Sequence, residues 1–343
     1  MKTFVLIGAG RIADRHVNAI IKNYGKLLGV FDTDQITLKA FCYRLSLKPF
    51  SSEKEAIKAA PDFFVICSDS GSHFELGMKY INHADLIIEK PLCVGLQDAE
   101  ELINYAENID KNIFVTHQNR FNNSVMQVHD YFAQHTDDEI FLSHVSLKWC
   151  RDDNYYDQAS WRGKYKTDGS VLSNQAIHHL DLLLFFLGEH HDVFASGGTI
   201  GSQIEVPDTV VATIKFDSGA LATVEASTAI RPKNIEASIS LCWNRGTLKI
   251  GGTAANTIEY FFNDLDTTKN LKDSTVSNSE DVYGAGHEMM YKYIIEDRKT
   301  VFLTSGQDAL RTLKLINDIH CSLEQNRMVQ RSENMYSKRL GIK

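Results

Sequence analysis

Residues 3–13 read Thr3-Phe4-Val5-Leu6-Ile7-Gly8-Ala9-Gly10-Arg11-Ile12-Ala13, a short apolar run that ends in a glycine-rich turn. The run predicts a buried strand, and the Gly-x-Gly-x-x-Ala pattern after it is typical of the turn that opens the first helix of a dinucleotide-binding βαβ unit. Unpaired N–H groups and the helix dipole favour a phosphate there. The residues that we expect around the phosphates are Gly8, Gly10, Arg11 and Ile12. On the motif alone, a glycine turn in another kind of α/β domain stays open as the alternative.

A carboxylate at the end of the next predicted strand supports a dinucleotide site. Asp32 follows Val30-Phe31 and stands 24 residues after Gly8, where a carboxylate accepts hydrogen bonds from the adenine ribose hydroxyls. A carboxylate there also repels a 2′-phosphate, and no arginine follows it immediately, so we expect NAD rather than NADP. The alternative reading of Asp32 is a solvated acid at a strand end.

The first part of the chain, up to about residue 122, alternates short Val/Ile/Phe-rich runs with longer helical patterns. The runs that we expect to be strands are 4–7, 27–31, 63–67, 86–88 and 113–116. This alternation is typical of βαβ units, whose strands are buried on both faces of a parallel sheet. We therefore predict an α/β protein in which residues 1–122 form a Rossmann domain with a doubly wound parallel sheet.

The remainder of the chain has a different pattern, of longer alternating strands joined by turn residues. Hairpins are expected for 209–216 with 220–227 and for 237–242 with 247–250, which predicts a mostly antiparallel sheet. Helices are expected over 173–187, ending at Gly188, and over about 305–325. Residues 265–281 are polar and are predicted to form a loop. We therefore predict a second α/β domain over residues 123–343.

Composition excludes several classes of function. Lys and Arg number 36 against 44 Asp and Glu, for a formal charge of −8, so the chain lacks the basic field that nucleic acid or an anionic membrane requires. The N-terminal run has no signal-peptide pattern, and the six cysteines are scattered without a Cys-x-x-Cys pair. We therefore expect a cytoplasmic protein that binds neither nucleic acid nor membrane.

Five separated motifs resemble those of the glucose–fructose oxidoreductase / inositol dehydrogenase (Gfo/Idh/MocA) family, in the same order and over nearly the whole chain. They are Gly8-Ala9-Gly10 with His16, residues 67–73, Glu89-Lys90-Pro91, residues 117–121, and residues 168–170 with 174–181. The resemblance implies an NAD-dependent dehydrogenase acting on CH–OH groups. It also implies that the second domain binds substrate and that its open sheet serves subunit contacts, in a homodimer or homotetramer. The residues that it places beside the cofactor are Ser68, His73, Glu89 and Gln118.

Lys90 is the first of two residues that the resemblance assigns to catalysis. It also follows the predicted strand 86–88, at the carboxyl edge of a parallel sheet where ligands bind. His178 is the second. On a regular helix it would share one face with Asn174 and Asp181. Family members of the inositol dehydrogenase type usually have aspartate where this chain has Asn174, and that departure disfavours a plain polyol substrate.

Alcohol oxidation needs a base for the hydroxyl proton and a group that stabilises the developing alkoxide. We assign His178 as the base and Lys90 as the stabiliser, although the family allows the two roles to be exchanged. No catalytic metal is expected. His178 and the adjacent His179 point about 100° apart on a helix, and His190 and His191 are expected in a loop without further ligands.

The segment before the His178 helix is rich in aromatic and arginine side chains. Aromatic rings stack on sugars or bases, and arginines pair with phosphates or carboxylates. The residues that we expect to bind substrate are Arg120, Arg151, Tyr155, Tyr156, Gln158, Trp161, Arg162, Asn174 and Gln175. The alternative is an aromatic loop that packs on its own domain.

Three functions follow from these observations. The segment is most similar to the family branch that oxidises the 3-hydroxyl of UDP-N-acetylhexosamine or its uronic acid, in the biosynthesis of surface polysaccharide or lipopolysaccharide sugars. An inositol or simple-sugar dehydrogenase is the second hypothesis. A non-catalytic NAD-binding regulator is the third, because a fold alone does not determine a function.

Overall fold

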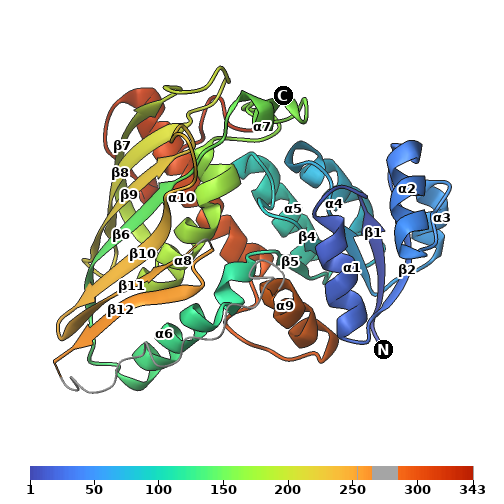
Figure 1. The fold of residues 1–343 in the computed structure, drawn as a ribbon, viewed down its shortest axis with the longest axis horizontal. Helices are drawn as coiled ribbons and strands as arrows, with labels where there is room; N and C mark the ends of the chain where they lie inside the picture. The colour runs from blue at the N-terminus through green and yellow to red at the C-terminus, as the bar shows by residue number, and fades with distance from the viewer. Residues whose placement is uncertain (253, 265–284, 343) are drawn as a thin grey trace. The chain divides into compact units, whose positions relative to one another are not determined.

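The computed structural model describes residues 1–252, 254–264 and 285–342, which form two compact units (Figure 1). Unit 1 consists of Met1–Cys93, Gln97–Gln118 and residues 285–310. Unit 2 consists of Val94–Leu96, the described residues between 119 and 264, and residues 311–342. The loop predicted at 265–281 lies outside the described residues.

Unit 1 is built on a parallel sheet of five strands in the order β2-β1-β3-β4-β5. The strands are β1 (Thr3–Ile7), β2 (Lys26–Phe31), β3 (Phe63–Ile66), β4 (Asp85–Ile88) and β5 (Ile113–Val115). Every neighbouring pair is parallel, and the apolar runs are buried as expected for strands covered on both faces. All five strands predicted from sequence are confirmed to within a residue at each end.

The helices of unit 1 bury one face each against this sheet or against one another. They are α1 (Ala13–Lys22), α2 (Gln35–Leu45), α3 (Glu53–Lys58), α4 (His73–Tyr80), α5 (Leu96–Asn108) and α9 (Ala285–Ile295). In α1 the buried residues include Ala13, His16, Val17 and Ile20, which follow the helical period. Helix α9, near the end of the chain, packs on α1. The sequence did not reveal this contact, because only tertiary packing connects the two segments.

Unit 2 contains an eight-stranded sheet in the order β12-β11-β10-β6-β9-β8-β7-β13. The strands are β6 (Ile140–Lys148), β7 (His190–Gly198), β8 (Thr209–Phe216), β9 (Leu221–Ser227), β10 (Glu236–Trp243), β11 (Gly246–Gly251), β12 (Thr257–Asn263) and β13 (Val329–Gln330). Only β6 and β9 pair in parallel. The predicted α/β fold, with a parallel N-terminal sheet and a mostly antiparallel C-terminal sheet, is therefore confirmed.

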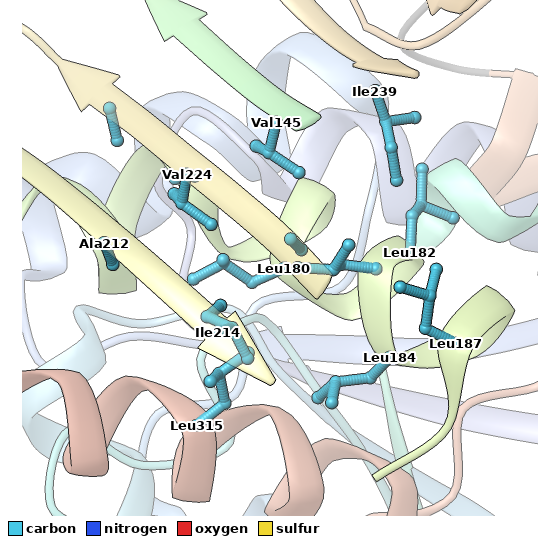
Figure 2. Packing of buried hydrophobic residues seen from close by; sticks show 14 of the residues in the cluster. Val145, Leu180, Leu182, Leu184, Leu187, Ala212, Ile214, Val224, Ile239 and Leu315 are labelled. Atoms are coloured by element: carbon cyan, nitrogen blue, oxygen red, sulfur yellow. The ribbon is translucent and has the colours of Figure 1, made fainter. Parts of the chain in front are cut away.

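Helices cover one face of the second sheet. They are α6 (Asn123–Gln134), α8 (Ile177–Leu187) and α10 (Gly306–Gln325), and the short α7 (Asp153–Asp157) lies before α8 in the chain. Figure 2 shows Leu180 and Leu184 of α8 packed towards Ile214 of β8, with Leu315 of α10 nearby. Burial of one such leucine stabilises the fold by about 1.5–3 kcal/mol. Strand β8 alternates buried and exposed residues, so the other face of the sheet is open.

Two local predictions need correction. His190 was expected in a loop, but it begins β7, is fully buried and lies 2.8 Å from Asp318 through its Nε2 and the Oδ2 of the aspartate. The helix predicted over 173–187 is present, but its first turn, Leu172–Ala176, is a π-helix that leads into α8. Gly188 ends α8 as predicted, with a positive φ of 83° that favours glycine, but its ψ of −150° lies outside the left-handed helical region that was expected.

Candidate active site

In unit 1, the predicted cofactor residues follow the carboxyl ends of neighbouring parallel strands. β1 leads to Gly8, β2 to Asp32, β3 to Ser68 and β4 to Glu89. The chain crosses over between β2-β1 and β3-β4-β5, so the strand order reverses beside β1. Open α/β sheets bind their ligands at this edge, where such a reversal occurs. The fold of unit 1 therefore gathers these residues at the edge that ligands use.

The glycine turn has the backbone and the open space that a pyrophosphate needs. Gly8 has a φ of 105°, and a Cβ there would lie 2.8 Å from the backbone of Cys67 and Ser68, so only glycine fits. A Cβ on the exposed Gly10 would meet nothing within 4 Å. The N–H of Ala9 donates to the Asp32 carboxylate at 2.7 Å, which holds that carboxylate beside the turn. These residues fit NAD: Gly10 would hold its pyrophosphate and Asp32 its adenine ribose.

His73 joins the turn after β3 to the turn after β4. Its Nδ1 donates to the carbonyl oxygen of Pro91 at 2.7 Å, and its Nε2 lies 3.4 Å from the carbonyl oxygen of Ser68. The ring is buried, and burial lowers its pKa. His73 therefore connects the turns after β3 and β4 as a neutral side chain.

The turns after β4 and β5 carry Glu89, Lys90 and Gln118, three of the predicted site residues. Glu89 is buried and Lys90 is half-buried, and the N–H of Lys90 donates to Glu89 Oε2 at 3.2 Å. Gln118 opens a short 3₁₀ helix, Gln118–Phe121. Its Oε1 is buried and has no hydrogen-bond partner among the described residues, which leaves an acceptor for a ligand.

In unit 2, the π-turn determines how the His178 helix presents its side chains. Asn174 and Gln175 lie in the π-turn, and His178 lies in the first turn of α8; all three are half-buried. The amide of Asn174 donates to the carboxylate of the buried Asp168. The expectation that Asn174 and His178 share one face assumed a regular helix. The π-turn changes that register by inserting an i→i+5 turn.

Asp181, the third residue of that expected face, pairs with Arg120. Arg120 donates through Nε and Nη2 to the two carboxylate oxygens, at 2.8 and 2.7 Å. Both side chains are buried. Arg120 was predicted to bind a substrate anion, but its guanidinium has a carboxylate partner inside unit 2. Arg120 therefore serves unit 2 as a member of a buried ion pair.

The aromatic segment forms a layered cluster of rings and guanidinium groups. Tyr155 has the guanidinium carbon of Arg151 at 5.0 Å and that of Arg162 at 4.2 Å from its ring centre. Trp149 and Trp161 stack on the same two arginines. Arg162 also donates to Gln158 Oε1 at 3.0 Å. The cluster packs within its own unit, as the alternative reading of the loop expects, yet Arg151, Tyr155 and Arg162 each remain partly exposed.

A small pocket adjoins this cluster. Its lining residues are Tyr155, Tyr156, residues 168–171, Asn174, Gln175, Val206 and Thr228. Gln175 donates to the Tyr155 hydroxyl at 3.0 Å and accepts from Arg151 at 3.2 Å. Four of the predicted substrate residues, Tyr155, Tyr156, Asn174 and Gln175, therefore line one pocket, and Arg151 contacts its rim.

The sequence analysis missed one polar cluster in unit 1. His16, Glu89 and His287 place a ligand-type atom each within 4.8 Å of one another, and Tyr291 hydrogen-bonds His16. His287 and Tyr291 lie four residues apart on one face of α9, and this spacing is the feature of the sequence that could have indicated the cluster.

Within the described residues, no helix is long and apolar enough to cross a membrane.

Fold and site together define an NAD-binding oxidoreductase. Residues 2–117 match the model of an oxidoreductase family with an NAD-binding Rossmann fold, and residues 127–254 match the GFO/IDH/MocA C-terminal domain. The chain belongs to the GFO/IDH/MocA family, and it is an NAD-dependent dehydrogenase.

Three known proteins show how this chain relates to the family. The WlbA dehydrogenase of Bordetella pertussis, solved with NADH and UDP-GlcNAcA, is 28% identical with a TM-score of 0.88, over 96% of this chain and 97% of that one. The myo-inositol 2-dehydrogenase of Thermotoga maritima is 26% identical over 65% of this chain and 67% of its own length. The UDP-N-acetylglucosamine 3-dehydrogenase GnnA of Acidithiobacillus ferrooxidans shares the fold at 19% identity, with a TM-score of 0.77 over 94% of this chain and 98% of that one.

Proposed function

We propose that this chain oxidises the 3-hydroxyl of a UDP-N-acetylhexosamine or of its uronic acid with NAD. The observation that carries the proposal is the cluster of Arg151, Tyr155 and Arg162 beside the pocket of unit 2. Two cations and an aromatic ring at one pocket suit a ligand that combines a ring with phosphate or carboxylate groups. A neutral polyol such as inositol has no group that needs two cations.

The arginines of this cluster keep donors for such a ligand. The Nε atoms of Arg151 and Arg162 are buried and have no hydrogen-bond partner among the described residues. A buried donor without a partner costs free energy, so an anionic ligand that accepts from it gains affinity. Asn174 and Gln175 would contact the sugar from the pocket floor, where their amides already point towards Asp168 and Tyr155.

Lys90 and His178 supply the acid–base chemistry in this proposal. When bound, NAD accepts the two electrons and the hydrogen of the oxidised carbon. His178 removes the hydroxyl proton, and the Lys90 ammonium hydrogen-bonds the same oxygen and stabilises its developing negative charge. Gly10, Asp32 and Gln118 hold the cofactor. No metal ion takes part.

The similarity to the WlbA dehydrogenase supports a nucleotide-sugar substrate, because that protein binds NADH and UDP-GlcNAcA and matches nearly the whole chain. An inositol or simple-sugar dehydrogenase is the second candidate, favoured by the similarity to a myo-inositol 2-dehydrogenase. The two candidates share a fold and differ at the pocket, so substrate profiling separates them.

Subunit contacts are proposed for the open face of the second sheet. Five apolar side chains on this face, each between 40% and 63% exposed, are Leu142, Phe194, Val211, Leu221 and Phe262. Large exposed apolar side chains spread over five strands are typical of an interface. A homodimer or homotetramer through this face would cover them, and sedimentation velocity of wild type and Leu221→Lys would measure it.

The test of the function is NADH formation, followed by its absorbance, with a panel of UDP-N-acetylhexosamines, their uronic acids, inositols and free sugars. Turnover of a UDP-sugar with the highest kcat/KM is the expected result. Highest turnover of inositol would favour the second candidate. Saturable NADH binding without turnover of any panel member would favour a non-catalytic regulator.

A further inference from the structure

A buried polar cluster lies beneath the carboxyl end of β4, next to Lys90. Its four side chains come from three segments: His16 from α1, Glu89 from the turn after β4, and His287 and Tyr291 from α9. Their exposures are 0% for His16 and Tyr291, 1% for His287 and 7% for Glu89. A carboxylate buried to this extent needs partners that compensate for lost water.

The hydrogen-bond directions in the cluster follow from Tyr291. Its hydroxyl is fully buried, and its one partner among the described residues is His16 Nδ1 at 2.8 Å. A buried hydroxyl donates where it has an acceptor, so Nδ1 accepts and the ring proton of His16 sits on Nε2. Nε2 then donates to Glu89 Oε1 at 2.9 Å. The chain of donors runs from Tyr291 through His16 to Glu89.

Glu89 is held as a carboxylate at the end of this chain. Burial alone would raise its pKa, but its contacts with the two histidines, the hydrogen bond from His16 above all, outweigh burial and hold the pKa well below its usual value. Nε2 of His287 lies 3.5 Å from the same Oε1. The other oxygen, Oε2, accepts the backbone N–H of Lys90 at 3.2 Å. The carboxylate therefore connects the cluster to the backbone of Lys90.

We propose that His16, His287 and Tyr291 form a clamp that holds the Glu89 carboxylate against Lys90, and that Glu89 is a positioning residue that keeps Lys90 protonated. This inference rests on the proposed function, in which the Lys90 ammonium stabilises the alkoxide. A fixed negative charge favours the charged form of a neighbouring lysine. The positive charge of the nicotinamide ring of NAD would disfavour the Lys90 ammonium, and the Glu89 carboxylate opposes that effect.

Four of the titratable groups around Glu89, namely Cys67, His73, His16 and Tyr291, are neutral near pH 7. Burial raises the pKa of Cys67 well above its usual value, and burial lowers the pKa values of His73 and His16. Burial also raises the pKa of Tyr291. The remaining titratable neighbours of Glu89 are His287, whose Nε2 lies 3.5 Å from Oε1, and Lys90, the next residue in the chain. Glu89 is therefore the negative charge of this cluster, and its Oε2 contacts the backbone of Lys90.

A metal ion is the main alternative occupant of the cluster, because two histidines and a glutamate within 4.8 Å can ligate one. Ligation by His16 Nε2 would require the ring proton on Nδ1, which would then face the Tyr291 hydroxyl and leave that buried hydroxyl without its acceptor. In the arrangement without a metal ion, the Tyr291 hydroxyl keeps its acceptor, so the hydrogen-bonded chain is favoured.

The test measures the protonation of Lys90 in the full-length, cofactor-free protein. Trace acetylation at a series of pH values, quantified by mass spectrometry at Lys90, gives the pH at which half of this amine is reactive. Glu89→Gln should lower that midpoint by about one pH unit, because it removes the negative charge. His287→Leu, which removes the polar ring 3.5 Å from Glu89 Oε1, should lower it as well, and His287→Gln, which keeps a polar side chain there, should restore most of the wild-type value. Met290→Ala, a packing change on the same helix, should leave the midpoint unchanged.

Coincident midpoints for wild type and Glu89→Gln would overturn the inference. So would a stoichiometric metal ion in purified wild type that His287→Leu loses, because the three side chains would then be ligands. Acetylation needs no turnover, so failure of the proposed function, seen as an inactive substrate panel, is distinguishable from failure of the clamp. In an active enzyme, the limb of the kcat profile that belongs to Lys90 should move to lower pH in Glu89→Gln.

Discussion

Arg120 and Asp181 form a bidentate ion pair inside unit 2, with Nε–Oδ2 and Nη2–Oδ1 distances of 2.8 and 2.7 Å. Their side chains are 5% and 1% exposed. Removal of one member leaves a buried charge unpaired, at a cost of about 3–5 kcal/mol. We predict that Arg120→Leu and Asp181→Asn each lower the free energy of unfolding by this order, measured by urea titration.

The exposed pair of Arg298 and Glu296 provides the control for this prediction. Arg298→Leu should change the free energy of unfolding by less than about 1 kcal/mol, because solvent screens an exposed pair. If Arg120→Leu instead weakened UDP-sugar binding at unchanged stability, Arg120 would return to the substrate site.

Lys90 and His178 are predicted to act in catalysis and not in cofactor binding. Positioned acid–base groups contribute about 10²–10⁴-fold, so Lys90→Ala and His178→Ala should each reduce kcat by at least about 100-fold. Fluorescence titration should show NADH binding that stays close to wild type. His179→Gln, a change at the neighbouring buried histidine, controls for disturbance of α8. Near-normal turnover of either alanine variant would remove that residue from the mechanism.

The parts of the fold that the sequence predicts are those with local causes. The apolar runs and the turn at Gly8 lie next to one another in the chain, and so do the strands and turns of the hairpins. The Arg120–Asp181 pair joins residues 61 positions apart, and the bond from Tyr291 to His16 spans 275 positions. The hydrophobic periodicity of a sequence does not indicate which distant polar side chains will pair. The π-turn at Leu172–Ala176 also lacked a signal, because its residues suit a regular helix equally well.

Arg151 and Arg162 are predicted to bind the anionic part of the substrate. Loss of a charge-assisted hydrogen bond costs about 1.5–3 kcal/mol, so Arg151→Met and Arg162→Met should each raise the Kd for the preferred UDP-sugar at least about tenfold. Methionine keeps most of the apolar stem that packs on Tyr155. Lys164→Met, at an exposed site in the same segment, is the charge-matched control. Isothermal titration measures all three, and equal affinities across the set would argue against the cluster as an anion site.

Asp32 is predicted to select NAD over NADP. Its carboxylate, held by the N–H groups of Ala9 and Asp34 at 2.7 and 2.8 Å, repels a 2′-phosphate. Asp32→Ala should raise the KM for NAD and narrow the ratio of kcat/KM between NAD and NADP. Asp14→Ala, at an acidic residue in the first turn of α1, serves as the comparison. An unchanged NAD/NADP ratio in Asp32→Ala would contradict the assignment.

Stability in acid should depend on two histidines of unit 2. Burial lowers the pKa values of His179 and His320 from 6.5 to about 4. A group whose pKa is lower in the folded state takes up its proton first in the unfolded chain, so stability is full above about pH 6.5 and is lost as the pH falls towards 4. In this window each histidine should remove about 1.4 kcal/mol of unfolding free energy per pH unit.

Urea titrations at pH 7, 6 and 5, chosen to span roughly that window, measure this loss. The free energy of unfolding should depend less steeply on pH in His179→Gln and His320→Gln than in wild type. His83→Gln, at an exposed site, is the matched control. Parallel pH dependence in wild type and both buried-site variants would show that neither histidine is the source of acid sensitivity.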